Sequence, residues 1–271
     1  MKIIIVPVSG GKDSQVVLGL ALEKYDKSQI VCVHQNTGYD HPDTYLTIEK
    51  ISQFYGVEIQ HTRNKFGGMF GFLEQAKYFP NSAARGCTQR LKQEPFAAWL
   101  RANKFTPENC EIWFGMRSDE SANRAAKYGE LKPDDVFTLG DVSTFYNNAK
   151  NRPLGLIPCL LPIVDWNTQA VFDYIEKSGA PLNPLYAKGH VRVGCYPCLL
   201  ARKSEWQSAG NDMYGRQNIL HLIEFEDKWR DEGNPRKFIK VHRKWDVRLF
   251  ISGESASLEP ETESECGYCS I

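Results

Sequence analysis

A short polar loop near the start of the sequence carries the residue types that bind phosphate. It follows an apolar run at residues 3–8 and comprises Ser9, Gly10, Gly11, Lys12, Asp13 and Ser14. Glycines let a backbone approach an anion, lysine and serine supply donors, and the aspartate could bind Mg²⁺. The loop lacks the glycine spacing of a Walker A motif. It therefore predicts a phosphate site of another type, with a plain connecting turn as the alternative.

Cysteines form the second reactive group, and the chain has eight of them. Two pairs have Cys-x-x-Cys spacing, Cys195 with Cys198 and Cys266 with Cys269. We expect a cytoplasmic protein, where clustered cysteines indicate metal or redox chemistry more often than disulfides. For Cys32, in a predicted strand, we expect the simpler role of a small buried apolar side chain.

The overall charge draws the protein to no particular partner. Lys plus Arg and Asp plus Glu both number 33, so the formal charge is zero and a nucleic acid would need a local patch. The best patch is 235–248, where Phe238 and Trp245 lie among basic residues. A solvated face beside the acidic residues 224–232 is the alternative. The N-terminal apolar run is too short to span a bilayer, so we expect no membrane partner.

Alternating strand and helix patterns predict the fold that positions these groups. Apolar runs at 3–8, 30–33, 57–59 and 111–115 read as strands of a parallel sheet. Helical patterns between them, including 94–104, predict a doubly wound, mostly parallel α/β sheet of the Rossmann-like type. Ligands of such sheets bind outside the carboxyl ends of the strands. The polar loop lies at that edge.

The remaining segments show weaker patterns of apolar residues. Residues 66–90 show no clean period, and 126–153 read as polar loop with a short strand near 136–139. Helices are expected from a cap at Asn167 to Gly179 and again over 217–231. We divide the chain into three parts. These are a nucleotide-binding α/β domain at 1–185, a cluster-binding loop with a helical and basic extension at 186–252, and an acidic, flexible tail at 253–271.

Several motifs together resemble a known family. The loop SGGKDS resembles the pyrophosphate loop of N-type ATP pyrophosphatases, which belong to the adenine nucleotide alpha hydrolase superfamily. Residues 115–121 (GMRSDES) with Arg124 resemble a motif of the phosphoadenosine phosphosulfate (PAPS) reductase family in that superfamily. Residues 162–166 (PIVDW), 183–186 (NPLY) and 194–198 (GCYPC) resemble further motifs of this family, in the same order. The resemblance covers about residues 1–200.

The resemblance implies a nucleotide site for ATP and Mg²⁺. Lys12 and the loop amides would neutralise the leaving pyrophosphate, with Mg²⁺ bridging to Asp13. Arg117 and Arg124 would hold phosphate or stabilise developing charge. The predicted nucleotide-binding set beyond the loop is Gly115, Arg117, Glu120 and Arg124.

The same resemblance implies an iron–sulfur cluster. Adenylylsulfate (APS) reductases hold a [4Fe–4S] cluster with a Cys-Cys pair and a later Cys-x-x-Cys. Counting back from Lys92 aligns Cys87 with the first cysteine of the pair and Thr88 with the second. Cys87, Cys195 and Cys198 would then leave one iron open, unless Cys159 or a tail cysteine binds it. The pattern is similar to enzymes of DNA phosphorothioation and to tRNA thiolases.

Three functions remain open at this point. The favoured one is ATP-dependent adenylation with cluster-dependent sulfur transfer, from a sulfur donor to a nucleic acid or small molecule, because Lys12 and Asp13 are intact whereas the reductases alter this loop. The second is an APS or PAPS reductase with Cys266 as nucleophile, since Glu265-Cys266-Gly267 resembles their tail, and with thioredoxin or glutathione as partner. The third is a nucleic-acid-binding protein with zinc at Cys195, Cys198, Cys266 and Cys269.

Overall fold

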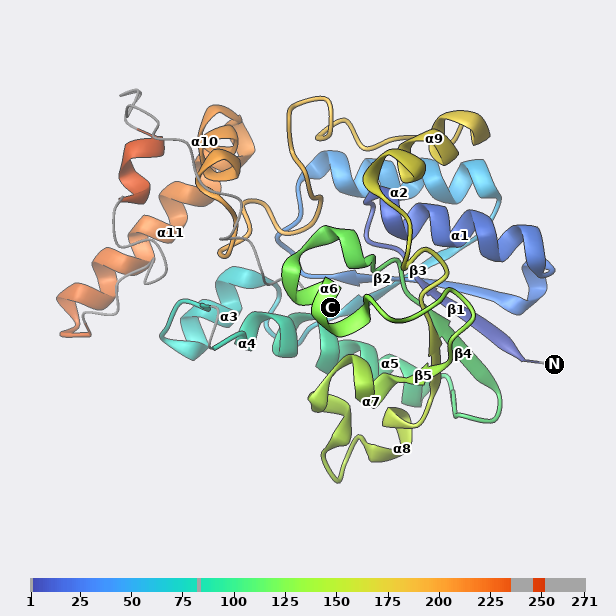
Figure 1. Cartoon of the computed structure of the whole chain (residues 1–271). Coiled ribbons are helices and arrows are strands. Elements are labelled where there is room, and N and C mark those ends of the chain that lie inside the picture. The colour runs from blue at the N-terminus through green and yellow to red at the C-terminus, as the bar shows by residue number, and fades with distance from the viewer. Residues whose placement is uncertain (1, 82–83, 235–245, 252–271) are drawn as a thin grey trace.

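A mostly parallel sheet forms the centre of the protein (Figure 1). The computed structural model describes residues 2–81, 84–234 and 246–251. In these residues the sheet is six-stranded, with the order β3-β2-β1-β4-β6-β5, and β5 runs antiparallel to β6. The strands are β1 (Ile3–Pro7), β2 (Ile30–Asn36), β3 (Ile59–Arg63), β4 (Cys110–Trp113), β5 (Phe137–Thr138) and β6 (Pro158–Leu160). The predicted doubly wound α/β class is confirmed.

Strand β1 shows why its apolar run folds this way. It pairs in parallel with β2 on one edge and with β4 on the other, and helices cover both faces of the sheet. Ile4 and Val6 face the core under α1, α2 and α9, whereas Ile5 faces the core over α5, α7 and α8. Figure 1 shows these two helix groups on opposite sides of the sheet. Neighbouring residues of one strand thus enter different cores.

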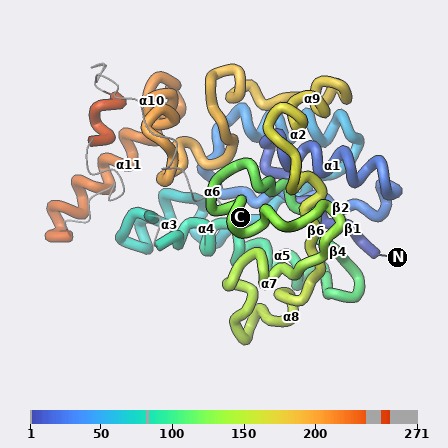
Figure 2. Tube along the Cα trace, in the orientation of Figure 1, coloured from blue at the N-terminus to red at the C-terminus, as the bar shows by residue number. Residues whose placement is uncertain are grey.

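Helices account for most of the remaining regular structure. They are α1 (Lys12–Lys24), α2 (Pro42–Tyr55), α3 (Met69–Ala76), α4 (Gly86–Thr88), α5 (Glu94–Ala102), α6 (Ala122–Tyr128), α7 (Leu139–Val142), α8 (Arg152–Gly155), α9 (Thr168–Ser178), α10 (Lys203–Asn211) and α11 (Met213–Asp231). Short 3₁₀ turns lie at η1 (Lys27–Gln29), η3 (Ser118–Glu120), η4 (Thr144–Asn147) and η5 (Val247–Phe250), and a π-helical turn at η2 (Gln89–Gln93). The chain trace shows α9 beside α1, where the Tyr174 hydroxyl donates to Glu23 Oε1 at 2.6 Å (Figure 2).

A third core lies at one end of the molecule, where α10 and α11 pack with α3 (Figure 1). Trp206 of α10 and Trp229 of α11 are fully buried in it. Cys195 and Cys198 pack against the same core from the loop that leads into α10. The C-terminal helices therefore support the loop that carries these cysteines.

The differences from the sequence prediction concern short elements and boundaries. Residues 66–90 and 126–153 contain helices of three to eight residues, too short to show a hydrophobic period. The strand expected at 57–59 is displaced to 59–63. Helix α11 begins at Met213 instead of residue 217, because the Asp212 side chain caps it by accepting from Gly215 N. Helix α10 and strand β6 were not predicted.

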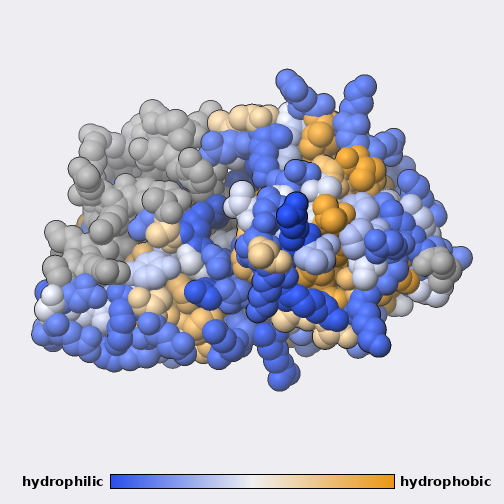
Figure 3. Space-filling model, turned by 90° about the horizontal axis from the view of Figure 1, so that it is seen from below, coloured by the Kyte–Doolittle hydropathy of each residue, from blue (hydrophilic) through white to orange (hydrophobic). Residues whose placement is uncertain are grey.

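The outer surface is largely hydrophilic on the face seen from below (Figure 3). Exposed large apolar side chains are spread over separate elements, among them Leu46 and Phe54 on α2, Leu156 after α8 and Met213 on α11. Among the described helices, none combines the length and apolar character needed to cross a membrane.

Candidate functional site

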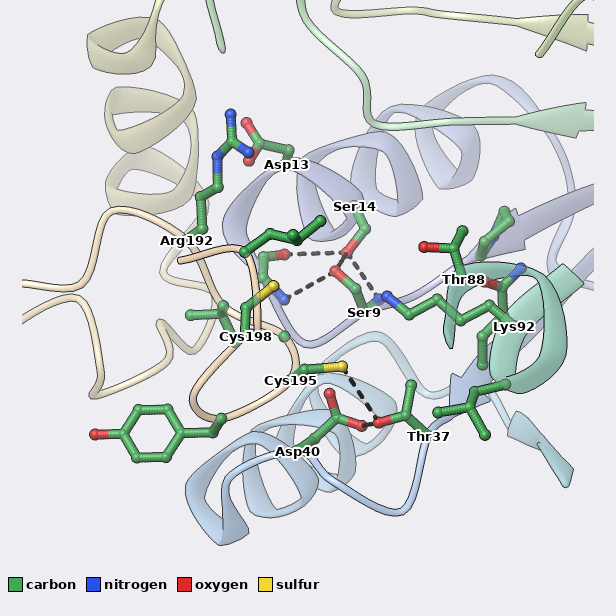
Figure 4. A pocket seen from close by; sticks show the side chains of 18 of the residues that line it. Ser9, Asp13, Ser14, Thr37, Asp40, Thr88, Lys92, Arg192, Cys195 and Cys198 are labelled. Atoms are coloured by element: carbon green, nitrogen blue, oxygen red, sulfur yellow. Dashed lines mark hydrogen bonds between the residues drawn. The ribbon is translucent and has the colours of Figure 1, made fainter. Parts of the chain in front are cut away.

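A cavity lies at the carboxyl ends of β1, β2 and β4, where the sequence predicts ligand binding. The loops that follow these strands line it, together with η2 and the cysteine-bearing loop before α10. Figure 4 shows Ser9 and Ser14 at its centre, Asp13 and Arg192 on one side, and Thr88 and Lys92 on the other. The predicted phosphate-binding loop, residues 9–14, which we call the phosphate loop, and the cysteines thus face one space.

The loop between β1 and α1 is held in shape by its own serines. Ser14 Oγ accepts from Ser9 N at 3.0 Å and donates to Gly11 O at 3.1 Å, and Ser9 Oγ accepts from Gly11 N at 3.3 Å. Gly10 has φ +76°, a left-handed conformation that favours glycine. The loop opens directly into helix α1, whose N-terminus favours an anion.

Gly115 lets a second loop reach this one. A Cβ added there would lie 2.7 Å from the carbonyl carbon of Asp13 and 2.8 Å from Ser14 N, both backbone atoms. Only glycine permits this approach without displacing the phosphate loop. The loop after β4 and the N-terminus of α1 therefore form one unit.

Charged side chains behind the loop form a network around Asp13. Arg117 Nε donates to Asp13 Oδ1 at 2.6 Å, and Lys12 Nζ donates to Asp13 Oδ2 at 3.0 Å. Burial lowers the pKa of Lys12, which the Asp13 carboxylate opposes. The network keeps Lys12 directed along the loop, above the rings of Tyr186 at 5.3 Å and Phe172 at 5.8 Å.

Arg117 lies behind the loop rather than in the cavity. It is 1% exposed and does not line the cavity. Besides Asp13, its guanidinium donates to Trp166 O at 3.1 Å, to Thr168 Oγ1 at 3.2 Å and to Asp119 Oδ2 at 3.3 Å. In this arrangement its donors are directed at the protein, so it orients Asp13. The contact with phosphate expected of Arg117 stays a prediction.

Mg²⁺ fits Asp13 poorly in this conformation. Both carboxylate oxygens already accept from cationic side chains, Arg117 and Lys12. A hard divalent ion prefers carboxylates that are not already neutralised by cations. Asp13 as placed therefore does not form a Mg²⁺ site.

Glu120 and Arg124 line the cavity and pair with each other. Glu120 Oε2 also accepts from Arg117 N at 3.2 Å, which ties the pair to the loop after β4. Gly10 and Lys12 do not line the cavity, while Gly11, Asp13 and Gly115 do. The predicted nucleotide residues thus divide into a lining group and a supporting group.

Three of the predicted metal ligands meet at the cavity. Cys87 reaches it from α4, and Cys195 and Cys198 reach it from the loop before α10, where Figure 4 shows both sulfurs. Thr88 lines the cavity too. Cys159 does not, because it is buried in β6 with its thiol directed to Ile157 O. Cys159 is therefore unsuited to supply a fourth bond in this fold.

The three cysteines do not form a site for a single metal ion as they stand. In the described part of the chain, no three Cys, His, Asp or Glu side chains lie close enough to hold one metal ion. A zinc ion needs all its sulfurs within about 2.3 Å, whereas cluster cysteines bind different iron atoms. A cluster held by Cys87, Cys195 and Cys198 stays a prediction.

Opposing effects act on these thiols. Burial raises the pKa of Cys195 to about 12, with the nearby Asp40 carboxylate adding to the effect. Burial also raises the pKa of Cys87. The ammonium group of Lys92 acts against both shifts and favours the thiolate form that binds metal.

The structure adds residues that sequence reasoning missed. Tyr186 contacts the phosphate loop, and Arg192 donates to Glu120 O at 2.9 Å from the cysteine-bearing loop. Thr37 donates to the buried Asp40 at 2.7 Å and lies 3.7 Å from Cys195 Sγ. Tyr186 stood within a recognised motif, but nothing in the local spacing indicated what it contacts.

Two predictions fall outside the described residues. Cys266 and Cys269 lie there, as do residues 235–245 of the basic segment. Of the basic residues in that segment, Arg248 is described, and its guanidinium donates to Glu226 at 2.9 Å and to Asp227 at 2.7 Å. Arg248 therefore pairs with acidic side chains of α11.

Comparisons with known proteins agree with the fold and the motifs. Residues 3–201 match the family model described as the phosphoadenosine phosphosulfate reductase domain. An uncharacterised protein of Methanocaldococcus jannaschii is 32% identical over 203 residues, which is 73% of this chain but only 36% of that protein. The adenosine 5′-phosphosulfate reductase of Rhizobium tropici is 26% identical over 62% of this chain and 81% of its own length.

A solved structure shows the same fold. The phosphoadenylyl-sulfate (PAPS) reductase of Candida auris, a phosphate complex, superimposes with a TM-score of 0.51 at 15% identity. The superposition covers 73% of this chain and 83% of that one.

Proposed function

Because this chain belongs to the phosphoadenosine phosphosulfate reductase family, we propose that it is an enzyme acting on an adenine nucleotide, and specifically an ATP-dependent sulfurtransferase. In the proposed reaction ATP is cleaved between its α and β phosphates. The adenylyl group passes to an oxygen of the acceptor and pyrophosphate leaves. Sulfide-level sulfur from a donor then displaces that oxygen, which leaves as part of AMP. The acceptor is a nucleic acid or a small molecule.

One observation carries the proposal: a single cavity is lined by both the phosphate loop and the three cysteines. Ser9, Gly11 and Ser14 represent the first group, and Cys195 and Cys198 belong to the second. A transfer enzyme needs its adenylated acceptor and its sulfur at one place, because the reacting atoms must meet. A protein that only bound nucleotide would not require three thiols at that place.

The chain's residues would act on the nucleotide as follows. The N-terminus of α1 and Lys12 would hold the leaving pyrophosphate, with Asp13 and Arg117 keeping Lys12 in position. Arg192 and Arg124 face the same cavity and would add positive charge near the phosphates. Because Lys12 is paired with Asp13, its ammonium group is orientated before any substrate binds.

Cys87, Cys195 and Cys198 would hold an iron–sulfur cluster. When bound, such a cluster would supply an iron atom able to hold sulfur beside the acceptor. Lys92 would favour the thiolate forms of Cys87 and Cys195, and the third core would keep the cysteine-bearing loop in place.

Anaerobic purification tests this proposal. We expect brown protein with iron and acid-labile sulfide, lowered strongly in Cys87→Ala, Cys195→Ala and Cys198→Ala. Cys110→Ala is the matched control, since Cys110 is buried in β4 away from the cavity. ATP with DNA or transfer RNA as acceptor should release pyrophosphate. Colourless protein with stoichiometric zinc would contradict the cluster.

Reduction of APS or PAPS is the second candidate. The observation that favours it is the similarity to a relative named adenosine 5′-phosphosulfate reductase. Sulfite release from APS or PAPS, lost in Cys266→Ser and sustained by thioredoxin or glutathione, would support this function. Pyrophosphate release without sulfite would instead support the first candidate.

A further inference from the structure

Residues 183–198 line one side of the cavity and contact the loops after β1, β2 and β4. Asn183 Nδ2 donates to Gly10 O at 3.2 Å, and Arg192 donates to Glu120 O. At the far end, Cys195 forms a β-bridge with Asp40. We call residues 183–198 the strap. The strap contacts the phosphate loop, and it also carries Cys195 and Cys198.

Tyr186 is the strap residue that contacts the start of α1. Its hydroxyl accepts from the backbone N–H of Lys12 at 3.0 Å, across 174 residues of sequence. A Cβ on Gly11 would lie 3.1 Å from the same oxygen. The phenol ring is held at 5.7 Å from the ring of Phe172, in an edge-to-face contact.

The Lys12 amide is a donor that a phosphate would use. It lies in the first turn of α1, where backbone N–H groups lack partners within the helix. A phosphate oxygen at this amide would take the place now held by the Tyr186 oxygen, because one N–H makes one good hydrogen bond. Burial raises the pKa of Tyr186, so the hydroxyl stays neutral and accepts this bond throughout the physiological range.

We propose that Tyr186 is a positioning residue that occupies the pyrophosphate-binding amide of Lys12 and is displaced when the nucleotide binds, which moves the strap and its two cysteines. The inference rests on the proposed ATP site. Displacement would link the arrival of ATP to the position of Cys195 and Cys198. The hydroxyl thus competes with phosphate instead of binding it.

Titration calorimetry of Tyr186→Phe with ATP, and separately with inorganic pyrophosphate, tests the competition. Loss of the competing oxygen should lower Kd for both ligands by about three- to tenfold, the range expected for one hydrogen bond. The matched control is Tyr174→Phe, which removes a hydroxyl bonded to Glu23 at the other end of α1. Its Kd should equal that of the wild type.

An equal or higher Kd in Tyr186→Phe would overturn the inference, since the hydroxyl would then be neutral or a phosphate ligand. Absence of ATP binding to the wild type would overturn the proposed function instead. Hydrogen exchange on the wild type gives an independent test that requires no variant. Amides of residues 187–194 should exchange faster with ATP bound, and slower exchange would show that the strap closes onto the ligand, contradicting displacement.

Discussion

Arg117 Nε lies 2.6 Å from Asp13 Oδ1, although Arg117 follows β4 and Asp13 lies in the first turn of α1. This contact joins the loop after β4 to the first turn of α1. Lys12 completes the arrangement through the other oxygen of Asp13. The phosphate loop therefore depends on a residue that does not line the cavity.

Removal of Arg117 should damage both stability and nucleotide binding. In Arg117→Ala the largely buried ion pair between Arg117 and Asp13 is lost, and Lys12 is left as the cationic partner of the Asp13 carboxylate. We expect the free energy of unfolding to fall by about 3–5 kcal/mol in urea titrations. Arg152→Ala, at an exposed position on α8, should stay within about 0.5 kcal/mol of the wild type. Equal losses in both variants would refute the supporting role of Arg117.

Gly115→Ala should disrupt the phosphate loop. The added methyl group would meet backbone atoms of Asp13 and Ser14, which cannot turn aside as a side chain would. We expect Kd for ATP to rise by about tenfold or more, equivalent to about 1.4 kcal/mol. Glu130→Ala is the control, because Glu130 is exposed and does not line the cavity. Unchanged ATP binding in Gly115→Ala would show that the two loops can separate freely.

Thr88→Cys should supply a fourth thiol to the cluster. Thr88 follows Cys87 and lines the same cavity. If one iron is open for sulfur, the new thiolate should bind it, change the electron paramagnetic resonance spectrum of the reduced protein and slow sulfur transfer. Lys150→Cys adds an exposed thiol elsewhere and should change neither property. Faster transfer in Thr88→Cys would contradict an open iron.

ATP affinity should fall at alkaline pH earlier than an ordinary lysine would allow. Burial lowers the pKa of Lys12, so its ammonium group loses its proton, and with it the attraction for phosphate, as pH rises towards this lowered value. Kd measured between pH 7 and 10 should therefore increase with pH. Lys12→Arg keeps its charge over this range and should flatten the profile. A Kd that does not change with pH in the wild type would refute the role of the Lys12 ammonium group in binding phosphate.

Much of the fold follows from local sequence. The continuous apolar run at residues 3–8 predicts a buried parallel strand, and strand β1 (Ile3–Pro7) forms there with apolar neighbours on both faces. Short helices such as α7 and α8 could not be predicted in this way, since one turn shows no period. The helix α10 was missed for a related reason. Its Trp206 is buried by tertiary packing that has no local signal.

The site was predictable where a motif is continuous and not where distant segments meet. The loop from Ser9 to Ser14 and the pair Cys195 and Cys198 could be read directly from their spacing. The position of Arg117 behind Asp13 could not, because spacing gives a residue's location along the chain but not the direction of its side chain. The contact between Tyr186 and Lys12 depends wholly on the tertiary fold.

The separation of 174 positions between Lys12 and Tyr186 also bears on how the protein is made. During synthesis the first strands and α1 leave the ribosome long before the strap. The contact between Lys12 and Tyr186 can therefore form only after most of the chain has been made. Contacts this far apart in sequence close late, because the chain entropy lost is large. Assembly of the cavity, and any loading of a metal centre at Cys195 and Cys198, should therefore be among the last events of folding.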